Sequence, residues 1–228
     1  MLTGAGISTE SGLPDFRSPG GLWDQYDPAQ LATVEALETT PLRFYEFYQR
    51  RLKALAGARP NPAHYALAEL QRRGRIGLIA TQNVDGLHQQ AGSTDVAELH
   101  GTLARAHCHR CGRSYPPAVL DVPIRTAADI PRCSDCGGMI RPSVVLFGEL
   151  LPEHEFRRAQ QAAERCDAML VVGSSLEVYP AAGLPEVARA HGARLFIVNL
   201  SATPYDQLAE AVVRARAGEV LPALAAAL

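Results

Sequence analysis

Four cysteines in two pairs constrain this chain more than any other feature. Cys108 and Cys111 form one C-x-x-C pair, and Cys133 and Cys136 form the other. Two such turns about twenty residues apart can bring four thiolates to one point, the arrangement that a tetrahedral zinc ion requires. All four cysteines are therefore predicted to bind Zn²⁺. A site with four protein ligands has no open coordination position, so the metal is expected to hold structure and the chemistry to lie elsewhere.

Disulfides and redox-active thiols are the two other interpretations of these cysteines. The first residues lack the basic region and apolar core of a signal peptide, and a redox C-x-x-C needs no second copy. A reducing, cytoplasmic location is therefore expected. The fifth cysteine, Cys166, is expected to be a buried small hydrophobic residue.

Length and charge limit the classes of function. With 228 residues and 47% apolar content, the chain can form a full core, and its length favours one large domain with a smaller one. The formal net charge of −2 argues against nucleic acid as the main partner. No apolar run is long enough to predict a membrane span.

Short apolar runs at 76–80, 168–172 and 195–198 indicate buried parallel strands. Helical patterns lie between and after them, at 62–73, 153–165 and 220–228. This alternation predicts an α/β fold, a Rossmann-like doubly wound parallel sheet. A small zinc-ribbon and helical domain is expected to be inserted in it, with the zinc module at about 107–139.

Polar clusters follow the predicted strands. They lie at 81–85, at 173–175, at Asn199 and, after a strand remnant at the start of the chain, at 4–8. Ligands of doubly wound sheets bind beyond the carboxyl ends of the strands, so the four clusters predict one crevice.

The glycine turn at 4–6 is suited to binding a pyrophosphate, but its sequence differs from the pattern of dehydrogenases. Its backbone N–H groups can face an anion, yet Thr9 stands where the third glycine of the dinucleotide fingerprint belongs. The loop at 11–21 is rich in glycine and proline. It is expected to be a mobile cover over the substrate rather than part of a hydride-transfer site.

Taken together, these segments resemble the sirtuins, the NAD-dependent protein-lysine deacylases, and look most like their bacterial class U branch. Family members normally carry a helix and a full first strand before the glycine turn, so a truncation or a late start codon is expected here. The resemblance rests on the segments 4–8, 14–17, 82–85, 99–101, 144–149, 173–175 and 198–199 and on both cysteine pairs.

The resemblance implies the cofactor NAD as well as Zn²⁺. Arg17 and its neighbours would line the nicotinamide end, and the backbone at 4–8 would lie near the phosphates. The implied NAD-binding residues are Gly4, Ala5, Gly6, Ile7, Ser8, Asp15, Phe16, Arg17, Gln82, Asn83, Val84, Asp85, Gly173, Ser174, Ser175, Asn199 and Ala217. The alternative role for Asp85 is a helix N-cap before residues 86–88.

His100 and Asn83 are the predicted catalytic residues. By resemblance, His100 is the general base on a ribose hydroxyl, and the acyl group passes from lysine to ADP-ribose, giving nicotinamide and O-acyl-ADP-ribose. Acylated lysine peptides of protein substrates are the implied partners, bound as an added strand. The implied peptide contacts are Val145, Phe147, Gly148, Glu149, Leu176 and Val178.

Tyr48 and Arg51 lie i, i+3 on a predicted helix and resemble the Tyr-x-x-Arg pair of desuccinylase-type sirtuins. The alternative is that Tyr48 packs internally and Arg51 faces water. Thr9 and Asp15 are instead typical of deacetylase-type branches, so both acetyl and succinyl groups are candidate substrates.

The whole chain, 1–228, is expected to be one catalytic domain and a monomer. Its Rossmann-like parts are predicted at about 1–30, 75–106 and 140–228, with insertions at about 31–74, which is helical, and 107–139, which binds zinc. The alternative functions are a mono-ADP-ribosyltransferase with the same NAD site, a non-catalytic NAD sensor and a zinc-ribbon module that binds nucleic acid.

Overall fold

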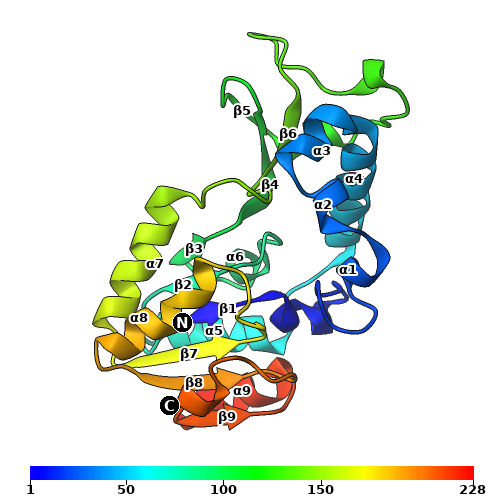
Figure 1. Ribbon diagram of the computed structural model, residues 1–228. Helices are drawn as coiled ribbons and strands as arrows, with labels where there is room; N and C mark the ends of the chain where they lie inside the picture. Colours follow the sequence, from blue (N-terminus) through cyan, green and yellow to red (C-terminus); the bar gives the residue numbers. More distant parts are fainter.

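The structure is a computed structural model that describes residues 1–228, except for the side chains of Trp23, Gln25, Pro28 and Ala29. Its larger sheet has six parallel strands in the order β3-β2-β1-β7-β8-β9 (Figure 1). These strands are β1 (Leu2–Thr3), β2 (Ile79–Thr81), β3 (Val96–Glu98), β7 (Ala168–Val172), β8 (Arg194–Val198) and β9 (Ala211–Val213).

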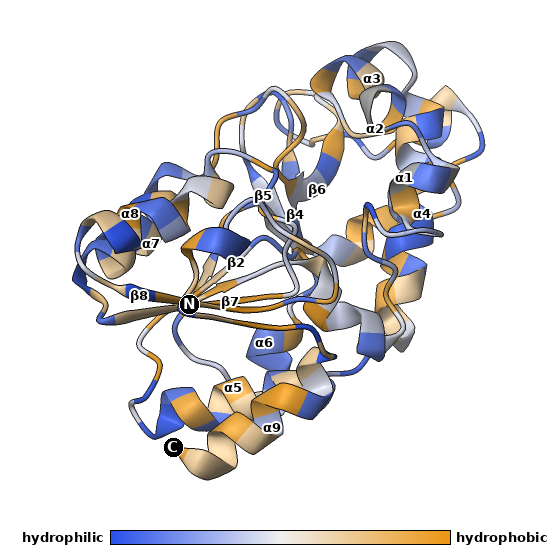
Figure 2. Ribbon diagram, turned by 60° about the horizontal axis from the view of Figure 1, so that its bottom comes forward, coloured by the Kyte–Doolittle hydropathy of each residue, from blue (hydrophilic) through white to orange (hydrophobic). Residues whose placement is uncertain are grey.

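Helices cover both faces of this sheet (Figure 2). Side chains of successive strand residues point to opposite faces. Val171 and Ile197 thus pack in one core with α7 (Glu153–Arg165) and α8 (Leu184–Ala190), while Val172 and Val198 pack in another with α5 (Pro62–Arg72) and α9 (Ala217–Ala227). The predicted doubly wound α/β fold is confirmed.

A second, antiparallel sheet carries the cysteines. It has the order β5-β4-β6, formed by β5 (Ser114–Tyr115), β4 (Gly101–Cys108) and β6 (Ile140–Val144). Leu103 and Ile140 of this sheet share a third core with Phe44 and Phe47 of α4. The helices of this part of the molecule are α1 (Leu22–Gln25), α2 (Pro28–Leu31), α3 (Val34–Thr39) and α4 (Pro41–Gly57).

The remaining short elements are α6 (Leu87–Gln90) and the 3₁₀ turns η1 (Ala5–Ser11), η2 (Pro117–Leu120), η3 (Ala127–Asp129), η4 (Ala181–Gly183) and η5 (Asp206–Leu208). Among the described helices, none is long and apolar enough to cross a membrane.

Several element boundaries differ from those predicted. The strand expected at 76–80 begins at Ile79 and ends at Thr81. Before it, the carbonyl oxygen of Gly77 accepts from the Gln71 side-chain amide at 3.0 Å. The last helix begins at Ala217, ahead of the expected 220, and ends at Ala227. Strand β9 was not predicted, since its three edge residues are too few to show a period.

Candidate active site and metal centre

A cavity of about 490 Å³ lies at the carboxyl ends of the central parallel strands. All four polar clusters expected at one crevice contribute to its wall, among them Gly4, Asn83, Ser174 and Asn199. Strands β1 and β7 are neighbours at the centre of the sheet, where the strand order reverses. This is the topological switch point at which doubly wound folds bind nucleotides.

Three glycines permit a close approach of two backbones at this point. The N–H of Gly6 donates to the carbonyl oxygen of Gly173 at 2.8 Å, and the N–H of Gly4 donates to that of Val172 at 3.0 Å. A Cβ added at Gly173 would lie 2.3 Å from the Ile7 nitrogen, and Gly173 has a φ of 62°. No other residue fits there without moving the turn, so the residues present form a cradle suited to a pyrophosphate.

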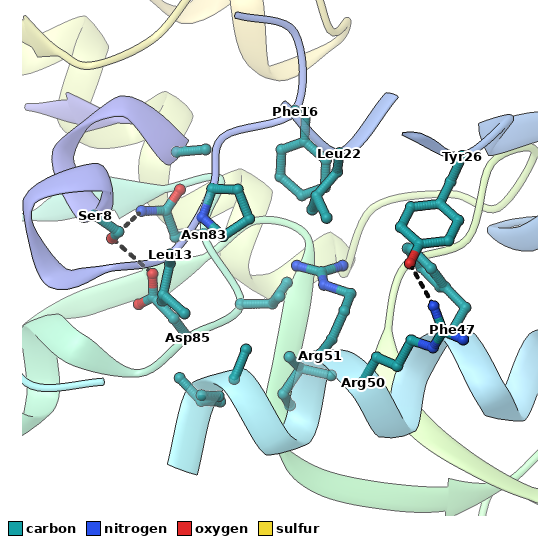
Figure 3. A pocket seen from close by; sticks show the side chains of 16 residues that line it. Ser8, Leu13, Phe16, Leu22, Tyr26, Phe47, Arg50, Arg51, Asn83 and Asp85 are labelled. Carbon is teal, nitrogen blue, oxygen red and sulfur yellow. Dashed lines mark hydrogen bonds between the residues drawn. The ribbon is translucent and has the colours of Figure 1, made fainter. Parts of the chain in front are cut away.

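Ser8 is the centre of a hydrogen-bond network beside this cradle (Figure 3). Its hydroxyl donates to Asp85 Oδ2 at 2.7 Å and accepts from Asn83 Nδ2 at 3.1 Å. The other oxygen of Asp85 accepts from the N–H of Leu87, the first residue of α6, at 2.9 Å, although the N-cap of this helix is Gly86 and not Asp85. Ser8, Asn83 and Asp85 together line a pocket beside the cavity. Carboxylate and amide groups of this kind can hold a carboxamide and a ribose.

His64 supports the same network from behind. Its Nδ1 accepts from the N–H of Asn61 at 3.3 Å, which leaves Nε2–H to face the Ser8 hydroxyl at 3.5 Å. Burial lowers the pKa of His64 to about 4, so the ring is neutral at pH 7. Sequence analysis did not single out His64. The signal that was missed is the N-cap at Asn61, which fixes where the His64 ring points.

His100 lines the cavity, and one of its two ring nitrogens is hydrogen-bonded to the backbone. Its Nδ1 lies 3.0 Å from the carbonyl oxygen of Gln82, which can only accept, so Nδ1 carries the proton and Nε2 keeps its lone pair. Burial lowers the pKa of His100, and the charge of Arg17 lowers it further. The neutral ring can therefore act as a base at cellular pH.

Gly101 places His100 against the second sheet. It has a φ of 74°, and a Cβ there would lie 2.1 Å from the Ser143 carbonyl oxygen. The carbonyl of His100 accepts from the N–H of Val145 at 2.9 Å. The close approach that Gly101 permits is made by the protein's own strand β6.

The loop before α1 brings Arg17 to the far wall of the cavity. Arg17 Nε lies 3.1 Å from Glu177 Oε2, an ion pair that the sequence did not indicate. The Asp15 carboxylate accepts from the N–H groups of Arg17 and Ser18 and from the Ser18 hydroxyl, so it shapes this loop. The Phe16 ring faces the cavity.

Arg51 points from α4 into the same region (Figure 3). Its guanidinium carbon lies 5.1 Å from the centroid of the Phe16 ring and 5.8 Å from that of Phe47. Within the described residues, no carboxylate lies at ion-pair distance from it. Tyr48 is buried one turn away, and burial raises the pKa of its hydroxyl to about 12, so this group is a hydrogen-bond donor.

Polar groups on the other side of the cavity are partly fixed. Gln82 Nε2 donates to the Ser174 hydroxyl at 2.8 Å, and Asn199 Nδ2 donates to the Ser201 carbonyl at 2.8 Å. The second bond leaves the Asn199 side-chain oxygen available as an acceptor. Ala217, at the start of α9, completes this wall.

Two predicted site residues have side chains in the cores and do not line the cavity. Ile7 is fully buried and packs with α5 and α9, and Leu176 is buried against the α7 and α8 face. They can contribute to a site only through their backbones. The remaining predicted peptide contacts line the cavity, and these are Val145, Phe147, Gly148, Glu149 and Val178.

The four paired cysteines converge as predicted. Their sulfur atoms all lie within 4.8 Å of one another. A tetrahedral zinc thiolate site separates its sulfurs by about 3.8 Å, so the residues present fit this metal. The Tyr115 hydroxyl donates to Cys133 Sγ at 3.1 Å, which lowers the pKa of that thiol to about 6 and favours the thiolate. His107 instead bonds to the Ser143 hydroxyl at 3.0 Å and so does not compete as a ligand.

Comparison with known proteins places this geometry in a family. The family model described as Sir2 family matches residues 4–180. The NAD-dependent protein deacetylase of Caldivirga maquilingensis is 52% identical over 220 residues, covering 96% of this chain and 84% of the relative. The NAD-dependent protein deacylase 2 of Pyrobaculum aerophilum is 48% identical over 224 residues, covering 98% and 88%.

Solved structures agree. A Sir2 homologue mutant in complex with ADP-ribose has a TM-score of 0.94 at 40% identity, covering 99% of this chain and 89% of that one. A complex described as Sir2, p53 peptide and NAD⁺ has a TM-score of 0.88 at 40% identity, covering 98% and 90%.

The fold and the site define a nucleotide-binding α/β enzyme with a separate thiolate metal centre. The chain belongs to the Sir2 family. The predictions of an NAD-dependent protein deacylase and of NAD and Zn²⁺ as its cofactors are confirmed.

Proposed function

We propose that this protein removes acyl groups from lysine side chains of proteins and transfers them to ADP-ribose. The observation that carries the proposal is one cavity whose wall contains a pyrophosphate cradle, Asn83 of the Ser8 network and a histidine with a free Nε2. Ser8 and Asp85 line a neighbouring pocket that shares Asn83 with this cavity. Bound NAD supplies the ADP-ribosyl group and the leaving nicotinamide. The printed names of the relatives, deacetylases and deacylases that use NAD, support the same activity.

The parts of NAD are assigned to different walls of the cavity. The backbone at 4–8 faces the phosphates, where its N–H groups favour negative charge. Gln82, Asn83 and Asp85, with Val84 between them, hold the nicotinamide carboxamide and its ribose. The phosphate and adenosine side takes Gly173, Ser174, Ser175, Asn199 and Ala217, and the loop residues Asp15, Phe16 and Arg17 cover the nicotinamide end.

His100 and Asn83 carry out the chemistry. The Nε2 of His100 accepts the proton of a ribose hydroxyl, because Nδ1–H is already bonded to the Gln82 carbonyl. Asn83 is fixed by its bond to Ser8 and by its N–H, which donates to the Thr81 hydroxyl at 3.1 Å. The Phe16 loop excludes water from the reacting groups.

The acylated peptide docks as a strand between 145–149 and 176–178. No hydrogen bond among the described residues uses the carbonyl oxygen of Val145 or the N–H of Gly148. An extended peptide can pair with such open backbone groups whatever its sequence. The solved Sir2 complex with a p53 peptide supports this partner class.

Tyr48 and Arg51 are proposed to bind an acidic acyl group such as succinyl, as expected of a desuccinylase-type member with class U features. Arg51 has a guanidinium over Phe16 and no carboxylate partner within the described part of the chain. An incoming carboxylate would therefore meet an available cation and, at Tyr48, a protonated hydroxyl.

The chain is proposed to act as one catalytic unit, a monomer in the cytoplasm. The Rossmann-like parts at 1–30, 75–106 and 140–228 hold NAD. The insertion at 31–74 contributes Ala32, Tyr48 and Arg51 to the cavity wall, and its helix α5 packs on α9, while the insertion at 107–139 carries the cysteines. Its five unpaired cysteines are consistent with a reducing compartment.

A direct test is to incubate the protein with acetyl- and succinyl-lysine peptides, with and without NAD. The proposal predicts that free lysine appears only with NAD and that one nicotinamide is released for each acyl group removed. Nicotinamide release without loss of acyl groups would instead indicate a mono-ADP-ribosyltransferase.

A further inference from the structure

Arg141 is a buried charged residue to which the proposed reaction assigns no role. It lies on β6, and its side chain is 6% exposed. One guanidinium nitrogen, Nη1, donates to the Val144 carbonyl oxygen at 3.0 Å, and the other, Nη2, donates to Glu149 Oε1 at 2.5 Å. The two bonds join the first and last residues of the segment 144–149 to one cation.

Glu149 completes this closure. Its second oxygen, Oε2, accepts from the N–H of Leu146 at 2.8 Å, and its own N–H donates to the Leu146 carbonyl at 3.0 Å. Both carboxylate oxygens thus accept hydrogen bonds from within the chain. Gly148 adopts a φ of 89°, which lets the chain turn back toward Arg141.

The charges around the pair leave Glu149 as the balancing anion. His107 lies opposite Arg141 in the β4–β6 register, and its Nδ1 bonds to the Ser143 hydroxyl at 3.0 Å. Tyr48 lies near both groups, with a raised pKa. The Arg141 Nε is buried with no hydrogen-bond partner among the described residues. Removing Glu149 would therefore leave a buried, uncompensated cation.

We infer that Arg141 is a positioning residue for the acylated peptide, and that it acts through Glu149 to hold the segment 145–149 in the shape that a docking strand needs. The inference rests on the proposed peptide site. A segment that is ordered before binding loses less conformational entropy when the peptide adds to it. The Arg141–Glu149 pair should therefore raise the affinity for the peptide. Among the described residues, neither Arg141 nor Glu149 forms a hydrogen bond or ion pair with the cradle at 4–6, so NAD affinity should not depend on the pair.

The test uses Glu149→Gln, Arg141→Lys and the double variant in the full-length, zinc-loaded protein. Glutamine keeps the shape of Glu149 without its charge, and lysine keeps the charge of Arg141 but cannot make both bonds. Arg157→Ala, which breaks the exposed Arg157–Glu153 pair on α7, is the matched control. Peptide binding by anisotropy, peptide KM, kcat, NAD affinity, zinc content and Tm are measured for each.

Each single variant is expected to weaken peptide binding and raise peptide KM at least about tenfold, as breaking a buried pair does. NAD affinity, zinc content and the control should stay at wild-type values. The double variant should lose no more peptide affinity than the single variant with the larger loss, because both residues act through one contact. Unchanged peptide affinity, or an equal loss of NAD and peptide affinity, would overturn the inference.

Peptide binding and turnover separate this inference from the proposed function. A wild-type protein that binds the peptide without deacylating it contradicts the proposed function. The variants then still test the role of the Arg141–Glu149 pair, because their peptide affinity can be measured by anisotropy. A wild-type protein that binds no peptide contradicts both.

Discussion

At the scale of single residues, one hydrogen bond decides what His100 can do. The Gln82 carbonyl takes the proton-bearing Nδ1, and burial lowers the pKa of the ring, so a neutral base faces the cavity at pH 7. The residue type suggested a base. The tautomer could not be predicted, because it depends on a carbonyl eighteen positions away in sequence.

The first prediction concerns His100→Ala. We expect NAD affinity to stay near the wild-type value while turnover falls roughly 10²–10⁴-fold, the usual contribution of a general base. In the wild-type enzyme, the lowered pKa should keep the base unprotonated to a more acidic pH, so the acid limb of kcat/KM should lie below about 6.5, the ordinary histidine value. Paired binding and rate measurements across pH test both points. Wild-type turnover in the variant would remove His100 from the mechanism.

Arg51 carries the second prediction. A guanidinium without a carboxylate partner should contribute about 1.5–3 kcal/mol to binding a succinyl carboxylate, roughly ten- to a hundredfold in kcat/KM. Arg51→Met should erase that preference and leave deacetylation nearly unchanged. The measurement is kcat/KM on matched acetyl and succinyl peptides. Equal loss on both peptides, or none on either, would mean that Arg51 does not read the acyl group.

At the scale of elements, glycines set how closely the strands and turns of the site approach. Gly173 after β7 and Gly6 in η1 bring two backbones within hydrogen-bond distance. In Gly173→Ala, the new Cβ would lie 2.3 Å from the Ile7 nitrogen at a positive φ, so the cradle must open. NAD affinity should fall at least about tenfold, with destabilisation of about 1–3 kcal/mol. Gly12→Ala, which also has a positive φ but no atom within 4 Å of a Cβ, is the control for strain alone. Similar NAD affinity in both variants would refute the cradle.

The cysteine module gives the fourth prediction. Cys108 is the last residue of β4 and pairs with Ile140 of β6. One ligand of the thiolate site therefore belongs to the second sheet. Structural zinc sites contribute on the order of 10–16 kcal/mol in isolated peptides. Cys133→Ser should therefore lower zinc content and Tm together, with activity lost as a result. Cys166→Ser, which changes a cysteine outside the cluster, should keep its zinc. A metal-free preparation with full activity and an unchanged Tm would contradict the structural role.

At the scale of the whole molecule, the parallel sheet was predictable and the contacts across the cavity were not. Apolar runs at 168–172 and 195–198 are long enough to identify β7 and β8, and the helix at 153–165 was placed correctly. The Arg17–Glu177 and Arg141–Glu149 pairs join residues by tertiary geometry alone. Their charges carry no periodicity, so only the folded chain shows them.

The same reasoning explains why the site as a set was easier to predict than its individual roles. The carboxyl ends of parallel strands lie at one edge of the sheet. Residues near 4–8, 82–85, 173–175 and 199 follow such ends, so their convergence could be predicted. Which atoms remain available depends on local bonds. One oxygen of the Asp85 carboxylate accepts from the N–H of Leu87. Both oxygens of the Glu149 carboxylate accept hydrogen bonds from groups within the chain.

The central claim is that this cavity transfers an acyl group from lysine to the ADP-ribose of NAD. The most direct measurement is to incubate the protein with NAD and an acetyl-lysine peptide and to identify every product by mass. The account predicts deacetylated peptide, nicotinamide and O-acetyl-ADP-ribose in equal amounts. Free acetate formed without consumption of NAD, or ADP-ribose attached to the peptide with its acetyl group intact, would contradict it.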